Sequence, residues 1–260
     1  MFKKKNYLKV IALQGPIAAS NKRTEKYKHY EMLETIRDIE KDDSIKGVLL
    51  RVNSPGGTAG ASSELAMSLD RLRKKKPIVA HVSDMACSGA LMASVAASKI
   101  VASPMAMIGS IGVIMQIPDF QNVAEKIGIG MRTFRSAEMK DIGNPFRDMT
   151  YKEKEYLQYT IDKNHEFFSQ YVENHRHTGC IDQINDGKFF IAEDALKYKL
   201  IDMIGTYDDA LNELLSLTGL NSAEIIKADD NDGLIDKIMS KLSFNLISSV
   251  KNEIFSQKMF

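Results

Sequence analysis

The sequence lacks several features that mark common functional classes. Its two cysteines, Cys87 and Cys180, form no Cys-x-x-Cys pair, which argues against a zinc ribbon or a thioredoxin-like redox site. No uninterrupted apolar run reaches the roughly 18 residues of a membrane span, and residues 1–9 are basic without the apolar region of a signal peptide. A net charge of +1 provides no general basic field, so we expect no nucleic-acid partner.

Nucleotide-binding motifs are missing as well. Neither the P-loop pattern nor the Gly-x-Gly-x-x-Gly pattern occurs, so we expect no nucleotide, no metal and no other cofactor. What the chain does have is 260 residues with 44% hydrophobic content, enough to bury a substantial core.

Short β-branched segments alternate with segments of helical spacing. The expected strands are residues 10–13, 45–52, 77–82 and 100–102, and the expected helices are residues 26–41, 62–75, 88–98, 150–177, 192–198 and 207–217. Such alternation predicts βαβ units and a parallel sheet, and therefore an α/β fold.

Ser88 is the first candidate for chemistry, because it begins the Ala-rich helix expected over residues 88–98. A nucleophile at a helix start gains from the helix dipole and from free backbone amides, and Gly89 lets a substrate approach closely. A simple N-cap role is the alternative. The neighbouring Cys87 is expected to be a small buried residue, because adjacent side chains at a helix start point in different directions.

A serine nucleophile needs a base, and the histidines do not provide an evident one. None lies in residues 103–118, the region that supplies the histidine of ClpP-like proteases. The five histidines are expected to be surface or core residues: His29, His81, His165, His175 and His177.

Four segments in a fixed order carry a family resemblance. They are Asn53–Gly57, Met85–Ala90, Gly109–Ile114 and Ser136–Asp141. In this order they resemble the S49 peptidases, the signal peptide peptidase A family, from about Lys9 to about Leu217. Two departures, Cys87 and Ala90 in place of the usual Ala and Gly, are both small. The resemblance implies a ClpP/crotonase-like fold and a serine endopeptidase with a Ser/Lys dyad.

The resemblance also assigns roles to residues. It implies that Ser88 is the nucleophile, that Lys140 is the base, and that Ser110 hydrogen-bonds the lysine amine. It further implies that Gly57 supplies one oxyanion amide and the helix start at Gly89 the other. A lysine acts as a base only when neutral, so Lys140 would have to sit in a dry site. Ser110 as an ordinary turn hydroxyl stays open as an alternative. Asp141, next to Lys140, is expected to point away from it.

The resemblance implies peptide substrates, such as remnant signal peptides or membrane-derived peptides, and ring- or dome-shaped homo-oligomers. Adjacent subunits would contribute the serine and the lysine. Many members carry an N-terminal membrane anchor that this sequence does not show. We therefore expect either a member from which the anchor was removed or a soluble member. The expected localisation is membrane-associated or cytoplasmic.

Residues 1–226 are expected to form the catalytic domain, and residues 227–260 a C-terminal amphipathic helical extension. Ile235, Ile238, Met239, Leu242 and Leu246 have helical spacing. This extension is expected to dock on a neighbouring subunit or a membrane surface, with packing on its own core as the alternative. Two other functions remain open: a crotonase-type acyl-CoA enzyme, and a non-catalytic membrane-associated scaffold on the same fold.

Overall fold

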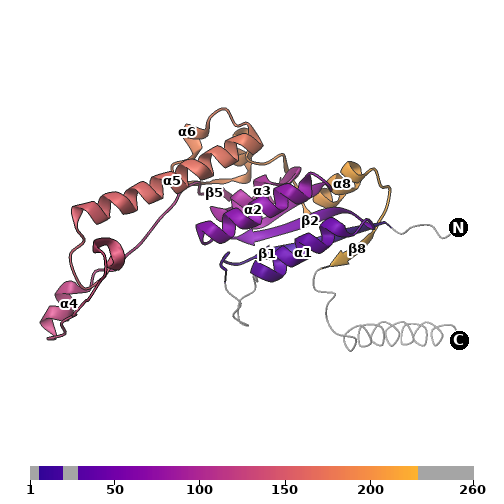
Figure 1. The fold of residues 1–260 in the computed structure, drawn as a ribbon. Coiled ribbons are helices and arrows are strands. Elements are labelled where there is room, and N and C mark those ends of the chain that lie inside the picture. Colours follow the sequence, from indigo (N-terminus) through magenta and orange to yellow (C-terminus); the bar gives the residue numbers. More distant parts are fainter. Residues whose placement is uncertain (1–5, 20–28, 228–260) are drawn as a thin grey trace, which may run out of the picture.

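The computed structural model describes residues 6–19 and 29–227, in which a twisted sheet is flanked by helices on both faces (Figure 1). The strands are β1 (Tyr7–Gln14), β2 (Ile45–Ser54), β3 (Ile78–Cys87), β4 (Lys99–Ala102), β5 (Met107–Gly109), β6 (Phe189–Ile191), β7 (Met203–Ile204) and β8 (Glu224–Lys227). The order is β6-β5-β3-β2-β1-β8, with β4 between β3 and β7. All described pairs are parallel except β5 with β6.

The helices follow the strands in βαβ order. They are α1 (His29–Lys41), α2 (Ala59–Arg73), α3 (Gly89–Val95), α4 (Gln121–Lys126), α5 (Tyr151–Arg176), α6 (Ile181–Ile184), α7 (Ala192–Lys197) and α8 (Tyr207–Thr218), with a short 3₁₀ helix η1 (Glu138–Asp141) before α5. The predicted α/β class with a parallel sheet and βαβ units is confirmed.

The central strands are buried on both faces because helices cover each side. In β2, Val48 and Leu50 pack into the larger core against α1 and α2, whereas Leu49 faces the smaller core under α8. This two-sided burial explains why β2 has a nearly continuous apolar sequence rather than an alternating one. Every residue of α3 is buried, and its alanines let it lie close to the sheet and to α2.

The segment from residue 113 to residue 150, which we call the arm, leaves the sheet and carries α4 and η1. Figure 1 shows α4 and the N-terminal end of α5 well away from the sheet. Apolar side chains of the arm are exposed in this single chain: Ile114, Met115, Phe120, Val123, Ile127, Ile129, Met131, Phe134 and Phe146. Phe134, at 96% exposed, is the extreme case.

The helix predicted over residues 150–177 is confirmed with defined ends. Thr150 caps α5 through a capping box with Glu153, and His177 ends the helix in the left-handed conformation. The sequence of this helix also predicts an apolar stripe at Leu157, Ile161, Phe168 and Val172. Of these residues, Phe168 and Val172 are buried, whereas Leu157 and Ile161 are half-buried because that part of α5 lies beyond the sheet.

Two expectations concern the C-terminal part of the chain. Strand β8 pairs with β1 in parallel up to Lys227, so the expected domain boundary falls at the end of a strand. The predicted amphipathic extension and its docking lie outside the described residues. Within residues 6–19 and 29–227, no helix combines the length and apolar character needed to cross a bilayer.

Candidate active site

Ser88 occupies a strained turn between β3 and α3. Its backbone angles are φ +52° and ψ −124°, a region that non-glycine residues rarely adopt. Such strain costs on the order of 1–3 kcal/mol and persists only where neighbouring contacts impose it. Here the N–H of Ser88 donates to the carbonyl of Gly109 at 2.8 Å, and the carbonyl of Ser88 accepts from Met92 at 3.1 Å. The predicted placement of Ser88 at a helix start is confirmed.

The loop after β2 packs directly against this turn. Gly56 has φ +92°, and a Cβ there would lie 2.7 Å from both the carbonyl oxygen of Cys87 and the amide nitrogen of Gly89. Any side chain at Gly56 would therefore push the two loops apart. Ser54 holds this loop against the residue that follows β1, because its hydroxyl donates to the carbonyl of Gly15 at 2.6 Å and accepts from the Gly56 N–H at 3.1 Å.

The backbone amides of Gly57 and Gly89 face the same space. Ile17 donates to the carbonyl of Gly56 at 2.8 Å and accepts from the N–H of Thr58 at 2.9 Å, so the intervening Gly57 N–H points away from that bridge. The Gly89 N–H begins α3 and has no intrahelical acceptor. A Cβ built on Gly89 would lie 3.5 Å from the Gly57 nitrogen, which places the two glycines side by side. Neither amide donates a hydrogen bond to a backbone carbonyl within residues 6–19 and 29–227, and two such adjacent amides are suited to stabilising an oxyanion.

A cavity of about 600 Å³ opens at Ser88. Ser88, Gly57 and Gly89 lie in its lining together with the polar side chains of Thr58, Ser62, Ser63 and Asn164. Much of the rest of the wall is apolar, with Ile17, Met92, Val113, Ile114, Phe167 and Phe168 among the lining residues. A cavity with apolar walls and a few convergent polar groups is the usual form of a site that binds an extended apolar ligand.

Ser110 and Cys87 lie close to the candidate nucleophile. Ser110 directly follows Gly109, the residue that accepts from Ser88, and it has φ +54° with its N–H donating to the carbonyl of Lys188 at 2.7 Å. Cys87 is half-buried, and burial raises the pKa of its thiol, so it stays protonated as the sequence interpretation requires.

Lys140 lies in η1 on the arm, exposed to solvent, and does not line the cavity of Ser88. The stretch Met131–Arg135 before it joins no strand. The neighbouring Asp141 pairs with Arg135 and with Arg147 rather than with the lysine. The carboxylate of Asp141 is therefore turned toward these arginines and not toward Lys140, as expected from the sequence. Within one chain, the structure brings Ser88, Gly57, Gly89 and Ser110 together and leaves Lys140 apart.

The described histidines have structural surroundings. His29 pairs with Glu64, His165 contacts the carbonyl of Asn185, and His175 contacts Asp70. His81 is buried in the middle of β3, and burial followed by the charge of Arg51 lowers its pKa. The residues that line the cavity include no His, Lys, Asp or Glu. No described cluster of three or more His, Cys, Asp or Glu side chains is arranged to hold a metal ion.

Sequence reasoning missed the contribution of α5 to the cavity. Asn164, Phe167 and Phe168 line it, although they follow Ser88 by more than seventy residues in the printed sequence. Phe168 stood in the predicted apolar stripe, but a helical stripe shows only that a face is buried and not against what. Asn164 carried no signal.

Comparison with known proteins gives a family match. Residues 70–221 match the sequence profile of Peptidase family S49. A candidate protease of Methanocaldococcus jannaschii is 45% identical over 201 residues, which cover 76% of this chain and 65% of that protein.

Two further relatives have informative names. A candidate signal peptide peptidase SppA of Enterococcus faecium is 31% identical over 206 residues, covering 78% of this chain and 60% of that protein. The candidate protease SohB of Haemophilus influenzae is 32% identical over 211 residues, covering 81% of this chain and 58% of that protein. The chain thus spans less than two thirds of the length of each of these relatives.

Proposed function

The chain belongs to peptidase family S49, and from this membership we propose that it is a serine endopeptidase with Ser88 as nucleophile and Lys140 as general base. Its parallel α/β sheet is of the ClpP/crotonase-like kind expected for the family. The observation that carries the proposal is the strained turn of Ser88, which opens on the cavity beside the two free amides of Gly57 and Gly89.

The base has to come from outside the residues that line the cavity, because none of them titrates near neutral pH. We propose that a second copy of the chain brings Lys140 to Ser88. The exposed apolar side chains of the arm support this, since soluble monomers rarely expose so many together. Ile114 is 78% exposed although it lies at the rim of the cavity, so a neighbouring arm that covered it would also close the site.

Burial between two subunits would favour the neutral form of a lysine, which is the form that accepts a proton. Neutral Lys140 then takes the hydroxyl proton of Ser88 while the Ser88 oxygen attacks the peptide carbonyl. The amides of Gly57 and Gly89 hold the resulting oxyanion. The tetrahedral adduct collapses, the C–N bond breaks, and the ammonium returns its proton to the leaving amine. Water, deprotonated by the same lysine, then attacks the acyl carbonyl, the ester C–O bond to Ser88 breaks, and the ammonium returns its proton to the Ser88 oxygen.

The apolar cavity wall suits substrates with apolar side chains next to the cleaved bond. Together with the name of the Enterococcus relative, this favours remnant signal peptides or other membrane-derived peptides as substrates. Such segments are apolar and therefore match the largely apolar wall of the cavity.

The other two functions have weaker support. A crotonase-type acyl-CoA enzyme would use an acidic base, and no acidic side chain lines the cavity. A scaffold without activity would not need the strain stored at Ser88.

Labelling with a fluorophosphonate tests the proposal, because this reagent reacts only with an activated serine. We expect the assembled protein to be labelled at one site, and Ser88→Ala to abolish the label. Ser216→Ala is the matched control, because Ser216 is an exposed serine on α8, the helix that covers the smaller core. An unlabelled wild-type oligomer would reject the peptidase in favour of one of the other two functions.

A further inference from the structure

The turn that carries Lys140 is tied at one end to the first turn of α5 and at the other end to Arg147, in the loop just before α5. At one end, the ammonium of Lys152 donates to the carboxylate of Glu138 at 2.8 Å. At the other end, Arg147 Nε donates to the carboxylate of Asp141 at 3.1 Å. Lys140 therefore lies in the sequence between two acidic residues, Glu138 and Asp141, that already form ion pairs with other basic side chains.

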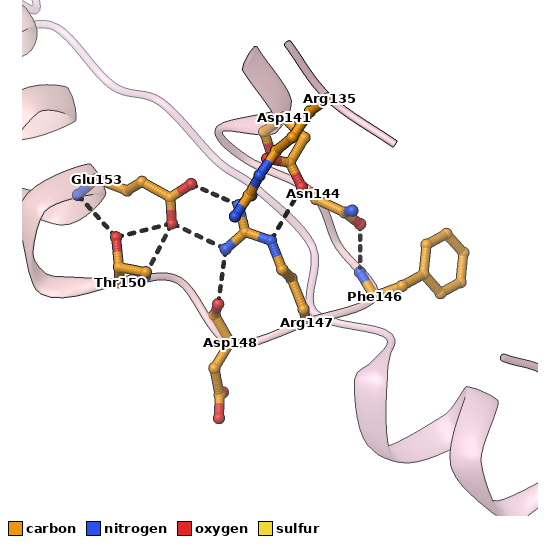
Figure 2. A network of polar contacts seen from close by, with 8 residues as sticks. All are labelled: Arg135, Asp141, Asn144, Phe146, Arg147, Asp148, Thr150 and Glu153. Atoms are coloured by element: carbon orange, nitrogen blue, oxygen red, sulfur yellow. Dashed lines mark hydrogen bonds and ion pairs between the residues drawn. The ribbon is translucent and has the colours of Figure 1, made fainter. Parts of the chain in front are cut away.

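Arg147 makes the more extensive of these two ties (Figure 2). Besides the carboxylate of Asp141, it donates through Nη2 to the backbone carbonyl of Asp141 at 3.3 Å. On its other side it donates to both carboxylate oxygens of Glu153, one of them at 2.9 Å, and to the carbonyl of Asp148 at 2.9 Å. One planar guanidinium thus joins η1, the following loop and α5, which a lysine ammonium lacks the fork geometry to do.

The α5 end of this link is firmly held. Glu153 is only 1% exposed, and its carboxylate accepts from the N–H of Thr150 at 2.8 Å while the hydroxyl of Thr150 accepts from the N–H of Glu153 at 3.2 Å. From there α5 runs as one continuous helix to Asn164 and Phe167 in the wall of the cavity. Arg147 therefore connects the lysine-bearing turn to the helix that forms part of the substrate site.

The link also determines the charge next to Lys140. Hydrogen bonds from Arg147, and then from Arg135, hold the pKa of Asp141 well below its usual range, so this carboxylate is ionised and turned toward the two arginines. Glu138 is likewise occupied by Lys152, which lowers the pKa of Glu138. Without Arg147, an ionised Asp141 with one partner fewer would lie directly beside Lys140 and favour its charged form.

We propose that Arg147 is the positioning residue of the general base: it locks η1 onto α5, and it keeps Asp141 away from the amine of Lys140. The inference rests on the proposed function, because it assigns Arg147 a role only through Lys140.

The test compares the pH dependence of kcat and KM in the assembled wild type and in Arg147→Met, with an apolar peptide substrate. We expect kcat to fall by about 10- to 100-fold, since a displacement of a catalytic group by about 1 Å has effects of this size. The acidic limb of the kcat/KM profile, on which activity rises with pH as the base loses its proton, should move to higher pH. KM should change little, because the cavity wall is intact. Arg147→Lys should recover only part of the activity.

Arg71→Met is the matched control, because Arg71 also pairs with a carboxylate, Glu40, but on the distant α1–α2 surface. It should keep the wild-type profile. Should Arg147→Met fold poorly, Asp141→Asn releases the η1 side alone and leaves the Arg147–Glu153 pair on α5 in place. It should lower kcat in the same direction. A wild-type kcat and pH profile in Arg147→Met would overturn the proposal, and so would a loss explained entirely by dissociation into monomers.

The Lys140→Ala background separates the two levels of the argument. If Lys140→Ala is inactive and Arg147→Met shows both the loss in kcat and the shift of its pH profile, Arg147 acts through the lysine. If Lys140→Ala retains activity, the proposed base is wrong and the role of Arg147 fails with it. If Lys140→Ala is inactive while Arg147→Met resembles wild type, only the positioning role is rejected.

Discussion

The backbone N–H of Ser88 donates to the carbonyl oxygen of Gly109 at 2.8 Å, so the strand that ends next to Ser110 holds the candidate nucleophile in its turn. Both serines have positive φ angles, of 52° and 54°. The hydrogen bond thus joins Ser88 to the residue that directly precedes Ser110, and it holds the two strained turns next to each other. Lys140, the other member of the proposed dyad, takes no part in these contacts.

Subunit complementation should restore activity to two inactive proteins. Ser88→Ala and Lys140→Ala are each expected to abolish peptide hydrolysis without unfolding the chain. If adjacent copies share each site, a mixture after subunit exchange pairs an intact serine with an intact lysine at about one quarter of the interfaces. Peptide turnover should therefore rise to roughly that fraction of the wild-type rate. Exchange demonstrated by labelled subunits without any recovery would place both residues in one chain.

Activity should be greatest under alkaline conditions. A lysine base works only when it is neutral, and even lysines with lowered pKa values usually titrate above histidine. The profile of kcat/KM against pH measures this. If activity instead rises with pH in the range of a carboxyl group, the acyl-CoA enzyme is favoured.

Much of the fold could be predicted from the sequence because the central strands and helices carry strong local patterns. The capping residues Thr150 and His177 end α5 where its periodicity predicted, and β2 has the apolar run of a strand buried on both faces. The shortest elements were not predicted. Strands such as β5 and β6 have three residues each and form because neighbouring strands offer an edge, which local sequence does not encode.

The site was predictable in part for a similar reason. Ser88, Gly57 and Gly89 stand in segments with distinctive small residues, and the close packing between these loops accounts for that composition. Lys140 came only from the family resemblance, because an exposed lysine on a 3₁₀ turn has no local signal of chemistry. Asn164 and Phe167 join the cavity through tertiary packing of α5, which no spacing in the sequence reveals.

Gly57 should not tolerate even an added methyl group. A Cβ at this position would lie 1.8 Å from the carbonyl oxygen of Ile17, and backbone atoms cannot move aside as a flexible side chain would. Gly57→Ala should therefore lower the free energy of unfolding by about 3 kcal/mol or more, at the upper end of overpacking costs. Gly60→Ala, with nothing within 4 Å of its Cβ, should be neutral or stabilise α2 by up to about 1 kcal/mol. Chemical denaturation of both variants makes the comparison, and equal losses would contradict the contact with Ile17.

Acid should weaken the arm through Glu153. The hydrogen bond from Arg147 lowers the pKa of Glu153 from an ordinary value of 4.5 to about 2. Because the folded state binds the proton more weakly than the unfolded state, the stabilisation is complete above pH 4.5 and is lost as the pH falls toward about 2. The difference in Tm between wild type and Glu153→Gln should therefore be largest near neutral pH and shrink below pH 4.5.

Glu166→Gln provides the control for this titration, because Glu166 lies on the same helix in an exposed pair with Lys163. Exposed pairs contribute little, so its Tm should stay close to that of wild type at every pH. A constant gap between Glu153→Gln and wild type down to acid pH would mean that the cap geometry, and not the charge of Glu153, stabilises α5.

The hydroxyl of Ser62 is expected to cost stability rather than contribute it. Ser62 is 2% exposed, its side chain packs against Gly89, and its oxygen forms no hydrogen bond with a protein group within the described chain. A buried hydroxyl without a partner costs about 1–3 kcal/mol, so Ser62→Ala should raise the free energy of unfolding by about 1 kcal/mol. Ser94→Ala is the matched control, because the Ser94 hydroxyl donates to the carbonyl of Ala90 at 2.7 Å and its loss should be neutral or destabilising. Urea unfolding of the two variants decides the matter. A Ser62→Ala protein less stable than wild type would show that this hydroxyl has a hydrogen-bonding partner, and that the contact between α2 and the start of α3 depends on it.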